Sequence, residues 1–368
     1  MRILALEPYY GGSHRAFLDG WMARSRHQWD LHSLSASRWN WRMHHAAITF
    51  ARELDPHGPW DCLFCTSMLD LASFLGLAPP SVQCLPCICY FHENQLTYPE
   101  SPMQRADDTF GFMNLKAGLA ADAVWFNSQF HRASFLSGLG ELMQRLPRPR
   151  LSFAIEDIRA RSSILPQGIQ PMPARPPRPS GPLHILWAAR WEHDKNPEDL
   201  FAALGILLER NVDFRVSVVG QQFRVQPPVF DHWRPRLGDR VVRWGYQPDR
   251  GAFVDALLEA DVMVSTAQHE FFGVGIMEGV AAGIYPLVPR RLSYPELLDA
   301  GAHPAFFYDG SPSSLADSLQ ALAGRVAGGA PMWETGSDAR DLAAPYLWPE
   351  LAPRLDDAVE HVLSGRLP

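Results

Sequence analysis

Two carboxylates, Glu270 and Glu278, stand eight positions apart in the segment HEFFGVGIMEG, with Gly273 and Gly275 between them. Ionised carboxylates are costly in an apolar interior unless they are paired, and two surface acids would not require the glycines. The apolar run at 260–267 precedes the segment, so the glycine turn is expected to follow a strand and open a helix. Free amides at a helix N-terminus favour phosphate. The pattern therefore predicts a binding site in which one carboxylate accepts hydrogen bonds from sugar hydroxyls and the other from a ribose diol.

A pair of cations in the segment AARWEHDKNPEDL belongs to the same half of the chain. Arg190 and Lys195 lie between an expected strand and an expected helix, at the carboxyl end of the strand. Paired cations at such a place suit a diphosphate, which is a multidentate anion. The alternative is a solvated loop with two ordinary charges. Lysine is rare in this chain, since Lys116 and Lys195 are the only lysines among 33 basic residues.

The composition is that of an ordinary globular protein. The chain has 368 residues, 46% apolar and 20% charged, and this length favours two domains. We see no signal peptide at the N-terminus and no apolar run long enough to span a membrane. Five cysteines, an odd number in a long chain, argue against a disulfide scaffold and favour the reducing cytoplasm. The net charge of −7 does not indicate a general nucleic-acid-binding surface, and nothing indicates an oligomeric state.

Short apolar runs alternate with helical patterns along the chain, which predicts parallel strands covered by helices on both faces. The proline-rich segment around 169–181 interrupts this alternation and reads as a semi-rigid linker. We therefore expect an α/β protein with two doubly wound domains, residues 1–168 and 182–352. A C-terminal helix at about 353–368 is expected to join the first domain. Ligands of such sheets bind at the carboxyl ends of the strands.

The Glu-x7-Glu pattern and the Arg190 and Lys195 pair resemble the retaining GT-B-fold glycosyltransferases of family 4. The resemblance implies two Rossmann-like domains that face each other across a cleft, the first binding the acceptor and the second the nucleotide sugar. It implies that Glu270 contacts the donor sugar and that Glu278 binds the nucleotide ribose. Arg190 and Lys195 would hold the diphosphate and neutralise the leaving group.

The resemblance also has consequences for the backbone and for metals. The amides of Phe272, Gly273 and Val274 are expected to contact the sugar and the phosphate. The sequence lacks an Asp-x-Asp motif, the metal-binding signature of the other main glycosyltransferase fold. The resemblance therefore implies a metal-independent reaction that needs no cofactor besides the donor substrate.

Several segments resemble a narrower family, the tRNA-queuosine alpha-mannosyltransferases. They include EPYYGGSH, SRWNWR, YFHENQLTYP, FGFMN, VWFNSQFHRASF and STAQHEFFGVGIMEGVAAGIYPLVPRRLSYPEL. The resemblance implies transfer of mannose from GDP-mannose to the cyclopentenediol of queuosine in the anticodon of tRNA-Asp, with retention of configuration. Two alternatives remain open: a glycosyltransferase with another nucleotide sugar and a glycan, lipid or small-molecule acceptor, or a non-catalytic sugar-nucleotide or RNA-binding module.

Further site residues follow from this resemblance. Gly11 and Gly12 would let the first loop approach the donor, although they also fit an ordinary tight turn. His92 would contact the donor sugar as a catalytic residue beside Arg190, Lys195 and Glu270, or it is a core histidine. The residues expected to line the acceptor side are His14, Trp39, Trp41, Arg42, Glu93, Asn94, Gln95 and Asn114.

The aromatic and polar members of that set have structural alternatives. Trp39, Trp41 and Arg42 could stack on or clamp an extruded base, since aromatic and arginine side chains are common RNA-stacking partners. The two tryptophans could equally pack between a helix and a sheet. A set of three residues is expected at the floor or rim of the site without assigned chemistry: Asn127, Ser128 and Arg132.

Two other patterns in the sequence could indicate binding sites. Cys62, Cys65, Cys84 and Cys87 have the spacing of a four-cysteine zinc site. Both pairs lie in runs that read as buried strands, where residues three apart point to opposite faces, so we interpret the cysteines as structural. Residues 145–178 carry seven arginines and two acids, which could meet tRNA phosphates or form a solvated loop.

Overall fold

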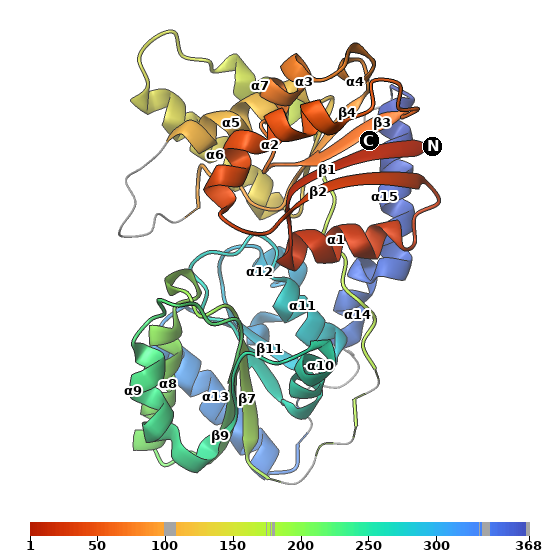
Figure 1. The fold of residues 1–368 in the computed structure, drawn as a ribbon. Coiled ribbons are helices and arrows are strands. Elements are labelled where there is room, and N and C mark those ends of the chain that lie inside the picture. The colour runs from red at the N-terminus through yellow and green to blue at the C-terminus, as the bar shows by residue number, and fades with distance from the viewer. Residues whose placement is uncertain are drawn as a thin grey trace. The chain divides into compact units, whose positions relative to one another are not determined.

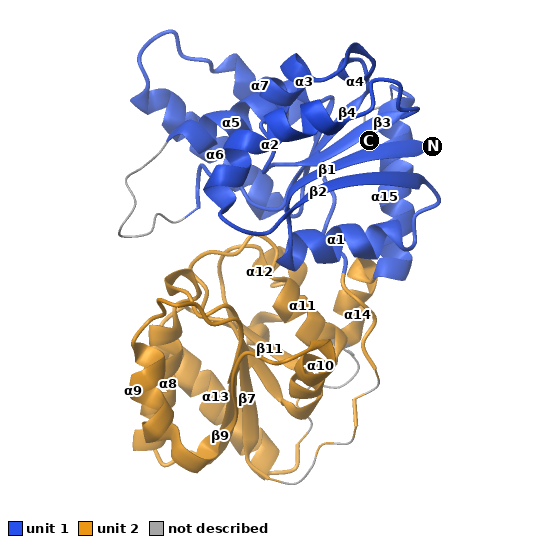
Figure 2. Cartoon of the chain, viewed as in Figure 1, with its two compact units in different colours: residues 1–168, 348–368 blue, residues 169–347 orange. Residues whose placement is uncertain are grey.

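The structure, a computed structural model, describes residues 1–98, 108–173, 175–176, 178, 181–330, 332 and 339–365. Pro99 of the YFHENQLTYP motif, positions 174, 177, 179 and 180 of the expected linker and positions 366–368 of the expected last helix lie outside these residues. The chain divides into two compact units (Figure 2). Unit 1 comprises residues 1–168 and 348–368, and unit 2 comprises residues 169–347.

Unit 1 is built on a six-stranded sheet in which every pairing is parallel, with the order β2-β1-β3-β4-β5-β6 (Figure 1). Its strands are β1 (Arg2–Tyr10), β2 (Gln28–Ser35), β3 (Cys62–Thr66), β4 (Cys87–Phe91), β5 (Ala123–Phe126) and β6 (Ser162–Ile164). Its helices are α1 (Gly12–Met22), α2 (Trp39–Glu53), α3 (Leu71–Leu77), α4 (Pro80–Gln83), α5 (Asp108–Ala120), α6 (Gln129–Arg145), α7 (Phe153–Ala160) and α15 (Trp348–Leu363).

Alternation along the strands gives this sheet two hydrophobic cores. Ile3 and Ala5 of β1 face the core that contains α1 and α15, whereas Leu4 and Leu6 face the core that contains α2, α3, α5, α6 and α7. Strands β3 and β4 are buried over their whole length, as expected for parallel strands covered on both faces. The apolar runs of the sequence therefore correspond to central strands.

The C-terminal helix α15 packs in unit 1, next to α1. It begins at Trp348, earlier than the expected start near 353, and Pro353 lies inside the helix. The Trp348 ring is buried, and a Cβ at Gly20 or Gly168 would lie only 2.2 or 2.4 Å from it. These two glycines thus make room for the tryptophan that anchors the helix.

Unit 2 has a second six-stranded parallel sheet with the order β12-β11-β10-β7-β8-β9. Its strands are β7 (Leu183–Ala188), β8 (Phe214–Val219), β9 (Val241–Gly245), β10 (Val262–Val264), β11 (Tyr285–Pro289) and β12 (Phe307–Tyr308). Its helices are α8 (Pro197–Glu209), α9 (Val229–Leu237), α10 (Arg250–Glu259), α11 (Val274–Ala281), α12 (Tyr294–Leu297), α13 (Pro312–Ala327) and α14 (Ala339–Ala343). Helices α8, α9 and α13 lie on one face and α10, α11 and α14 on the other (Figure 1).

The strand order of unit 2 is the Rossmann order, and the predicted α/β fold with two doubly wound sheets is confirmed. In each sheet the order of the chain reverses at one place, between β1 and β3 in unit 1 and between β7 and β10 in unit 2. Loops at the carboxyl ends of strands leave in opposite directions at such a switch point, which makes it the favoured ligand-binding place. Among the helices that the structure describes, none combines the length and the apolar character needed to cross a membrane.

Candidate functional site

The predicted cation Lys195 lies at the switch point of unit 2. It ends a short 3-10 helix, His193–Lys195, that follows β7, and its side chain is buried. The ammonium Nζ donates to the carbonyl oxygen of His269 at 2.9 Å and lies 3.0 Å from the carboxylate of Asp194 and 3.4 Å from that of Glu270. The loops after β7 and β10 therefore meet at this ammonium, as the sequence predicts.

Lys195 and Glu270 stabilise each other's ionised form. Burial opposes the charge of Lys195, but the carboxylates of Glu270 and Asp194 outweigh it and raise the pKa of Lys195. Burial also opposes the charge of Glu270, but Lys195 and His269 lower the pKa of Glu270. The side chain of Glu270 is 30% exposed, so an ionised carboxylate remains accessible beside a buried ammonium.

Two residues that the sequence reading missed hold Lys195 in place. Thr266 donates from Oγ1 to the Lys195 carbonyl at 2.8 Å and accepts from Nε1 of Trp187 at 3.0 Å. Asp194 accepts from the backbone amide of Gln268 through its own carbonyl, and its carboxylate forms an ion pair with Lys195. The adjacency of Asp194 to Lys195 was the available signal, whereas Thr266 is recognisable only once β10 is placed beside β7.

Arg190, the other predicted cation, is more exposed than Lys195. It follows β7, and its side chain is 45% exposed. The guanidinium lies 3.0 Å from the carboxylate of Glu192, which is a second acidic partner on the same loop. The structure thus places both predicted cations after β7, one buried and one at the surface.

The glycine turn opens helix α11, as predicted. Gly273 is the residue before the helix and has φ of 86°, a backbone conformation that side chains rarely adopt, and a Cβ there would lie 2.8 Å from Tyr294. The amide of Val274 belongs to the first helical turn, where backbone donors have no partner within the helix. A small cavity is lined by residues of this turn and its neighbours, including Lys195, Glu270, Gly273, Gly275 and Tyr294.

Glu278 lies one turn into α11 and forms an ion pair that the sequence reading missed. Its Oε1 accepts from Nη2 of Arg250, at the start of α10, at 2.6 Å. Burial raises the pKa of Glu278, and Arg250 partly offsets this effect. The side chain of Phe272 is buried and packs edge-on against Tyr346. Only the backbone of Phe272 could therefore take part in binding.

In unit 1, His92 follows β4 directly and is buried. Its Nδ1 lies 2.9 Å from Nε2 of Gln167, and because an amide nitrogen donates, Nδ1 is the acceptor and Nε2 carries the proton. Burial lowers the pKa of His92 well below its usual value, so the ring is neutral. Its Nε2 is a buried donor without a partner among the described residues, as expected of a group that binds a ligand oxygen.

His14, in the first turn of α1, lies between two carboxylates. Its Nδ1 donates to Oε2 of Glu7 at 3.1 Å, and its Nε2 lies 3.2 Å from both carboxylate oxygens of Glu93. The His14 ring lies 4.1 Å from that of His92 and is tilted against it by 31°. Glu7, His14 and His92 form the only group of potential metal ligands among the described residues, with ligand atoms within 4.8 Å of one another. Both nitrogens of His14, however, point at carboxylates within the protein.

The polar loop after β4 is held by two asparagines. Asn94 accepts through Oδ1 from the backbone amides of Leu96 and Thr97, both at 3.0 Å. Asn114 accepts from the amide of Gln95 at 2.8 Å and donates to the carbonyl of Ser67 at 2.9 Å. Both asparagines are buried and shape the loop, and Nδ2 of Asn94 is a buried donor without a hydrogen-bond partner among the described residues.

The two tryptophans at the start of α2 differ in exposure. Trp39 packs against Phe110 at 5.1 Å in a small apolar cluster. Trp41 is 59% exposed, with its ring 5.1 Å from that of His45. Arg42 donates to the carbonyl and hydroxyl of Ser35. Trp41 is therefore the tryptophan with a free aromatic face, and Trp39 is a packing residue.

Gly11 and Gly12 follow β1 at the switch point of unit 1. A Cβ at Gly11 would lie 2.3 Å from the Cβ of Ala36, and Gly12 has φ of 52° with no atom within 4 Å of a built Cβ. Gly11 is thus required by packing within unit 1, whereas Gly12 leaves open space at the start of α1.

The residues expected at the floor or rim support their neighbours. Asn127 donates from Nδ2 to the carbonyl of His92 at 2.9 Å, which fixes the backbone of that histidine. Ser128 caps α6 by accepting from the amide of His131. Arg132 is bonded to Gln129 at the surface.

Most arginines of the stretch at 145–178 have partners inside the protein. Arg175 and Arg178 both contact the carboxylate of Asp261 in unit 2. Arg161 donates to the carbonyls of Leu119 and Ala121 in unit 1. Arg145 and Arg159 form surface ion pairs. Arginines of this stretch therefore stabilise the structure of both units.

Cys65 and Cys89 are neighbours on β3 and β4, but among the described residues no three cysteines come together as potential metal ligands. Cys62 faces the core with α1 and α15, and Cys65 faces the opposite core, which confirms that the two residues point to different faces of β3. The expectation that Cys84 lies in a buried strand is wrong: it is exposed at the end of α4, because Pro86 delays the start of β4 to Cys87. All five cysteines are free.

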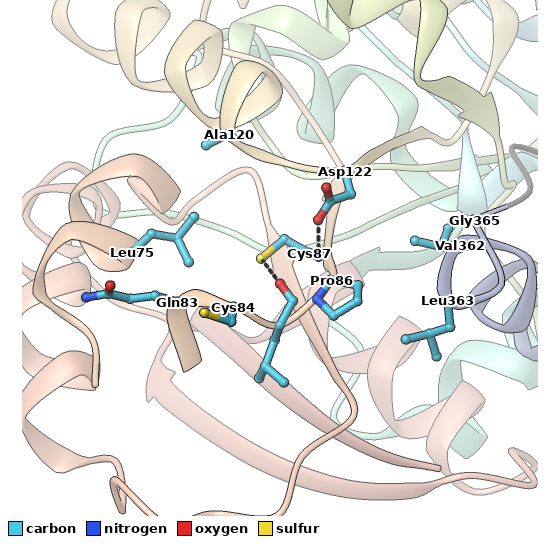
Figure 3. A pocket seen from close by; sticks show the side chains of 11 residues that line it. Leu75, Gln83, Cys84, Pro86, Cys87, Ala120, Asp122, Val362, Leu363 and Gly365 are labelled. Atoms are coloured by element: carbon cyan, nitrogen blue, oxygen red, sulfur yellow. Dashed lines mark hydrogen bonds between the residues drawn. The ribbon is translucent and has the colours of Figure 1, made fainter. Parts of the chain in front are cut away.

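A cavity of about 530 Å³ lies at the amino ends of β4 and β5, at the edge of the sheet opposite to the one where His92 lies (Figure 3). It is lined by Cys87 and by Leu363 of α15, among others, and Asp122 accepts there from the amide of Cys87 at 2.8 Å. Ligands of parallel sheets bind at the opposite, carboxyl edge. Lys195, Glu270 and His92 all follow the carboxyl ends of strands. The candidate site is therefore assigned to the carboxyl edges, although the cavity at the amino ends is larger.

Comparisons with known proteins agree with this arrangement. Residues 2–169 match the family described as tRNA-queuosine alpha-mannosyltransferase N-terminal, and residues 169–323 match the family described as glycosyl transferases group 1. Over 307 residues the chain is 36% identical to the tRNA-queuosine alpha-mannosyltransferase of Drosophila melanogaster, covering 80% of this chain and 81% of the fly protein.

Two more distant similarities are informative. The chain is 25% identical over 146 residues, 38% of its length and 35% of the relative, to the GDP-mannose-dependent alpha-(1-6)-phosphatidylinositol dimannoside mannosyltransferase of Mycobacterium tuberculosis. Sucrose-phosphate synthase from Thermosynechococcus elongatus has a TM-score of 0.75 at 13% identity, covering 99% of this chain and 100% of that one. The last similarity concerns the fold alone.

Proposed function

The chain belongs to the tRNA-queuosine alpha-mannosyltransferase family of GT-B-fold glycosyltransferases, and from this premise we propose that it transfers mannose from GDP-mannose to queuosine. The acceptor is the cyclopentenediol of queuosine in the anticodon of tRNA-Asp, and the anomeric configuration is retained. The observation that carries the donor half of the proposal is the buried ammonium of Lys195 beside the ionised Glu270.

Unit 2 is assigned to the donor. Lys195 and Arg190 bind the diphosphate, and the first amides of α11, from Phe272 to Val274, add hydrogen-bond donors. The accessible carboxylate of Glu270 accepts from sugar hydroxyls. Glu278, one turn further along the helix and 13% exposed, accepts from the ribose diol.

The reaction needs charge stabilisation at the leaving group. The bond between the anomeric carbon and the diphosphate oxygen breaks, the acceptor oxygen bonds to the same face of the sugar, and the acceptor proton passes to the departing phosphate. Lys195 and Arg190 stabilise the negative charge that develops on this phosphate, which is the usual largest contribution to catalysis of such steps. Because two cations supply this charge, we propose that no metal ion is required.

Unit 1 is assigned to the acceptor and contributes His92. The neutral ring of His92 donates from Nε2 to a hydroxyl of the donor sugar. Trp41, with its exposed ring, and Arg42 are assigned to the anticodon bases, because base stacking on an aromatic ring is worth about 1 to 3 kcal/mol.

The proposal is tested by incubating the protein with GDP-mannose and queuosine-containing tRNA-Asp and measuring the mass of the modified nucleoside. We expect one hexose on queuosine. The same tRNA lacking queuosine, and the same reaction with UDP-glucose in place of GDP-mannose, are the controls and should give no product.

Two outcomes would contradict parts of the proposal. A hexose transferred equally well from UDP-glucose would overturn the donor assignment. No transfer to queuosine, together with saturable GDP binding, would overturn the acceptor and keep a glycosyltransferase with a different one.

A further inference from the structure

Helix α2 of unit 1 presents an exposed stripe of which the proposed function uses only Trp41. Trp41 is 59% exposed and Ile48 is 60% exposed, although both are large apolar residues. Four residues at intervals of four, three and four positions form the α2 stripe: Trp41, His45, Ile48 and Arg52. This spacing places them on one face of a helix. The opposite face packs into the core through Phe50.

Arginines flank the α2 stripe at both ends of the helix. Arg38 precedes the first turn of α2, and Arg52 lies in the last turn. Both arginines are exposed, and neither forms an ion pair or a side-chain hydrogen bond with any residue that the structure describes. The only acid of α2, Glu53, follows Arg52 and therefore lies about 100° around the helix from it. The stripe is thus positively charged in a chain whose net charge is −7.

The ring of Trp41 is supported from within the helix by His45. The two ring centroids lie 5.1 Å apart. Nε2 of His45 accepts from Nη1 of Arg42 at 3.2 Å, because a guanidinium can only donate, and Nδ1 donates to Oγ1 of Thr49 at 2.9 Å. Burial and the charge of Arg42 lower the pKa of His45, in agreement with this neutral form. Trp41 therefore presents an exposed ring above an uncharged, hydrogen-bonded neighbour.

The size and composition of the stripe favour a nucleic-acid strand over a protein or a membrane. Because a large aromatic side chain buries about 150 to 250 Å², the exposed parts of Trp41 and Ile48 together offer roughly 250 Å². One partner contributes about 800 Å² to a specific protein interface. A membrane-binding helix has a large apolar face, whereas His45 lies between the two apolar residues here. Aromatic rings and arginines are the groups that bind the bases and phosphates of single-stranded RNA.

The direction of α2 connects the stripe to the candidate site of unit 1. The helix follows β2, so it begins near the carboxyl edge of the sheet, where His92 lies, and runs toward the amino edge (Figure 1). From Trp41 to Arg52 the helix rises about 16 Å, which is the length of several nucleotides of one strand. An RNA strand with its reacting nucleoside at the carboxyl edge would therefore continue over the stripe.

We propose that the α2 stripe binds the RNA strand on one side of the modified nucleoside, with Arg38 and Arg52 on phosphates and Ile48 against a ribose or a base. The inference rests on the proposed function, because it names the surface that holds the tRNA outside the reaction site. Phosphate contacts fix the register of a nucleic acid without reading its sequence. The stripe therefore contributes to affinity for the tRNA and has no part in the choice of sugar.

The test compares two double variants that lose equal charge. Arg38→Gln with Arg52→Gln, the stripe variant, removes the cations at the two ends of α2. Arg148→Gln with Arg150→Gln, the loop variant, removes two exposed arginines between α6 and α7. Fluorescence anisotropy of a labelled RNA hairpin with the sequence of the tRNA-Asp anticodon arm measures binding without turnover.

We expect the stripe variant to bind the hairpin about tenfold more weakly at about 0.15 M salt. The slope of log Kd against log salt concentration should fall by about 1.4 to 1.8, because two phosphate contacts are lost. The loop variant should bind within about twofold of the wild type. General attraction by positive charge would weaken both variants equally, so the comparison isolates the position of the arginines.

Steady-state kinetics with the whole tRNA supply a second readout. The stripe variant should raise KM for the tRNA by about tenfold and leave kcat and KM for GDP-mannose within about twofold, a result that misfolding would not give. Ile48→Ser should raise KM for the tRNA by about threefold. Phe153→Ser, at a residue of α7 that is 57% exposed, is its control and should change no constant.

Four results would overturn the inference: no hairpin binding by the wild type, wild-type binding by the stripe variant, equal losses in both double variants, or sedimentation of the wild type with phosphatidylserine vesicles that the stripe variant loses. The last result would assign the stripe to a membrane. Hairpin binding through the stripe without modification of queuosine would contradict the proposed function alone. Modification of queuosine with an unchanged KM in the stripe variant would contradict this inference alone.

Discussion

Each unit holds a buried cation between two carboxylates near the switch point of its sheet, but the two cations are of different kinds. In unit 2 it is the ammonium of Lys195, with Asp194 at 3.0 Å and Glu270 at 3.4 Å. In unit 1 it is the imidazolium of His14, with carboxylates at 3.1 and 3.2 Å. An ammonium is charged at any physiological pH, whereas an imidazole is charged here only because its neighbours hold the proton.

This difference between Lys195 and His14 indicates different functions for the two cations. A permanent cation suits a diphosphate, whose charge must be met throughout the reaction and increases when the phosphate leaves. The imidazolium of His14 has only two N–H donors, and both point at carboxylates, so its effect is to orient its partners. The comparison therefore separates the proposed diphosphate-binding cation of unit 2 from a cation in unit 1 whose two N–H groups both face carboxylates.

The largest effect is expected from Lys195→Met, which removes the ammonium and keeps an apolar side chain of similar length. Turnover should fall by about 100-fold, as when a donor that stabilises a developing negative charge is removed. Single-turnover rates with GDP-mannose and saturating tRNA measure this effect.

The matched control is the other lysine of the chain. Lys116 pairs with Asp70 at 2.9 Å in unit 1 and is 44% exposed. Lys116→Met should change turnover by less than about twofold, because exposed ion pairs contribute little. Equal rates for the two methionine variants would remove Lys195 from the donor site.

The second prediction separates the two cations by pH. The pKa of His14 is raised in the folded protein to about 10, so its contribution to stability is complete below the unfolded value of about 6.5 and is lost as the pH rises toward 10. Between about pH 7 and pH 9 the free energy of unfolding should therefore fall, with a slope from this group of at most about 1.4 kcal/mol per pH unit.

Urea unfolding of three proteins tests that slope. His14→Gln should lack it, whereas Lys195→Met should keep it, because the pKa of Lys195 is raised from an already alkaline value and does not titrate in this range. The same pH dependence in the wild type and His14→Gln would show that His14 is not a buried cation.

The two clusters also differ in how far the sequence reveals them. The parallel sheets follow from buried apolar runs such as β3 and β4. The donor cluster is readable because Glu270, Gly273 and Glu278 lie within one short segment, so local spacing carries the information. Glu7 and Glu93 come from distant segments and meet only through the pairing of β1, β3 and β4, which no local pattern encodes.

The same reason explains what the sequence leaves open. Asn94 and Asn114 are polar residues near the expected site, and residue type alone does not show that their side chains bond to the loop backbone. Trp39 and Trp41 are two positions apart on one helix and therefore face different sides, one packed and one exposed.

The third prediction asks whether Glu278, the proposed ribose-binding carboxylate, acts on one substrate only. Glu278→Gln should raise KM for GDP-mannose by about tenfold and change kcat by less than about twofold, because its contact is made equally in the ground state and the transition state. Glu259→Gln is the control in the same unit, since Glu259 forms a similar ion pair with Arg243 at 2.6 Å. A rise in KM for the tRNA instead of the donor would reverse the assignment of Glu278.

The smallest effect is expected where the sequence spacing is most suggestive. Four cysteines match the spacing of a zinc site, yet Cys62 and Cys65 point into different cores of unit 1. Cys62→Ala with Cys65→Ala should leave kcat and both KM values within about twofold of the wild type and lower stability by roughly 1 to 2 kcal/mol through lost packing. Turnover assays, thermal unfolding and metal analysis of the purified protein measure these effects. A tenfold loss of activity together with one metal ion per wild-type chain would mean that spacing, rather than the strand geometry, had identified the functional group.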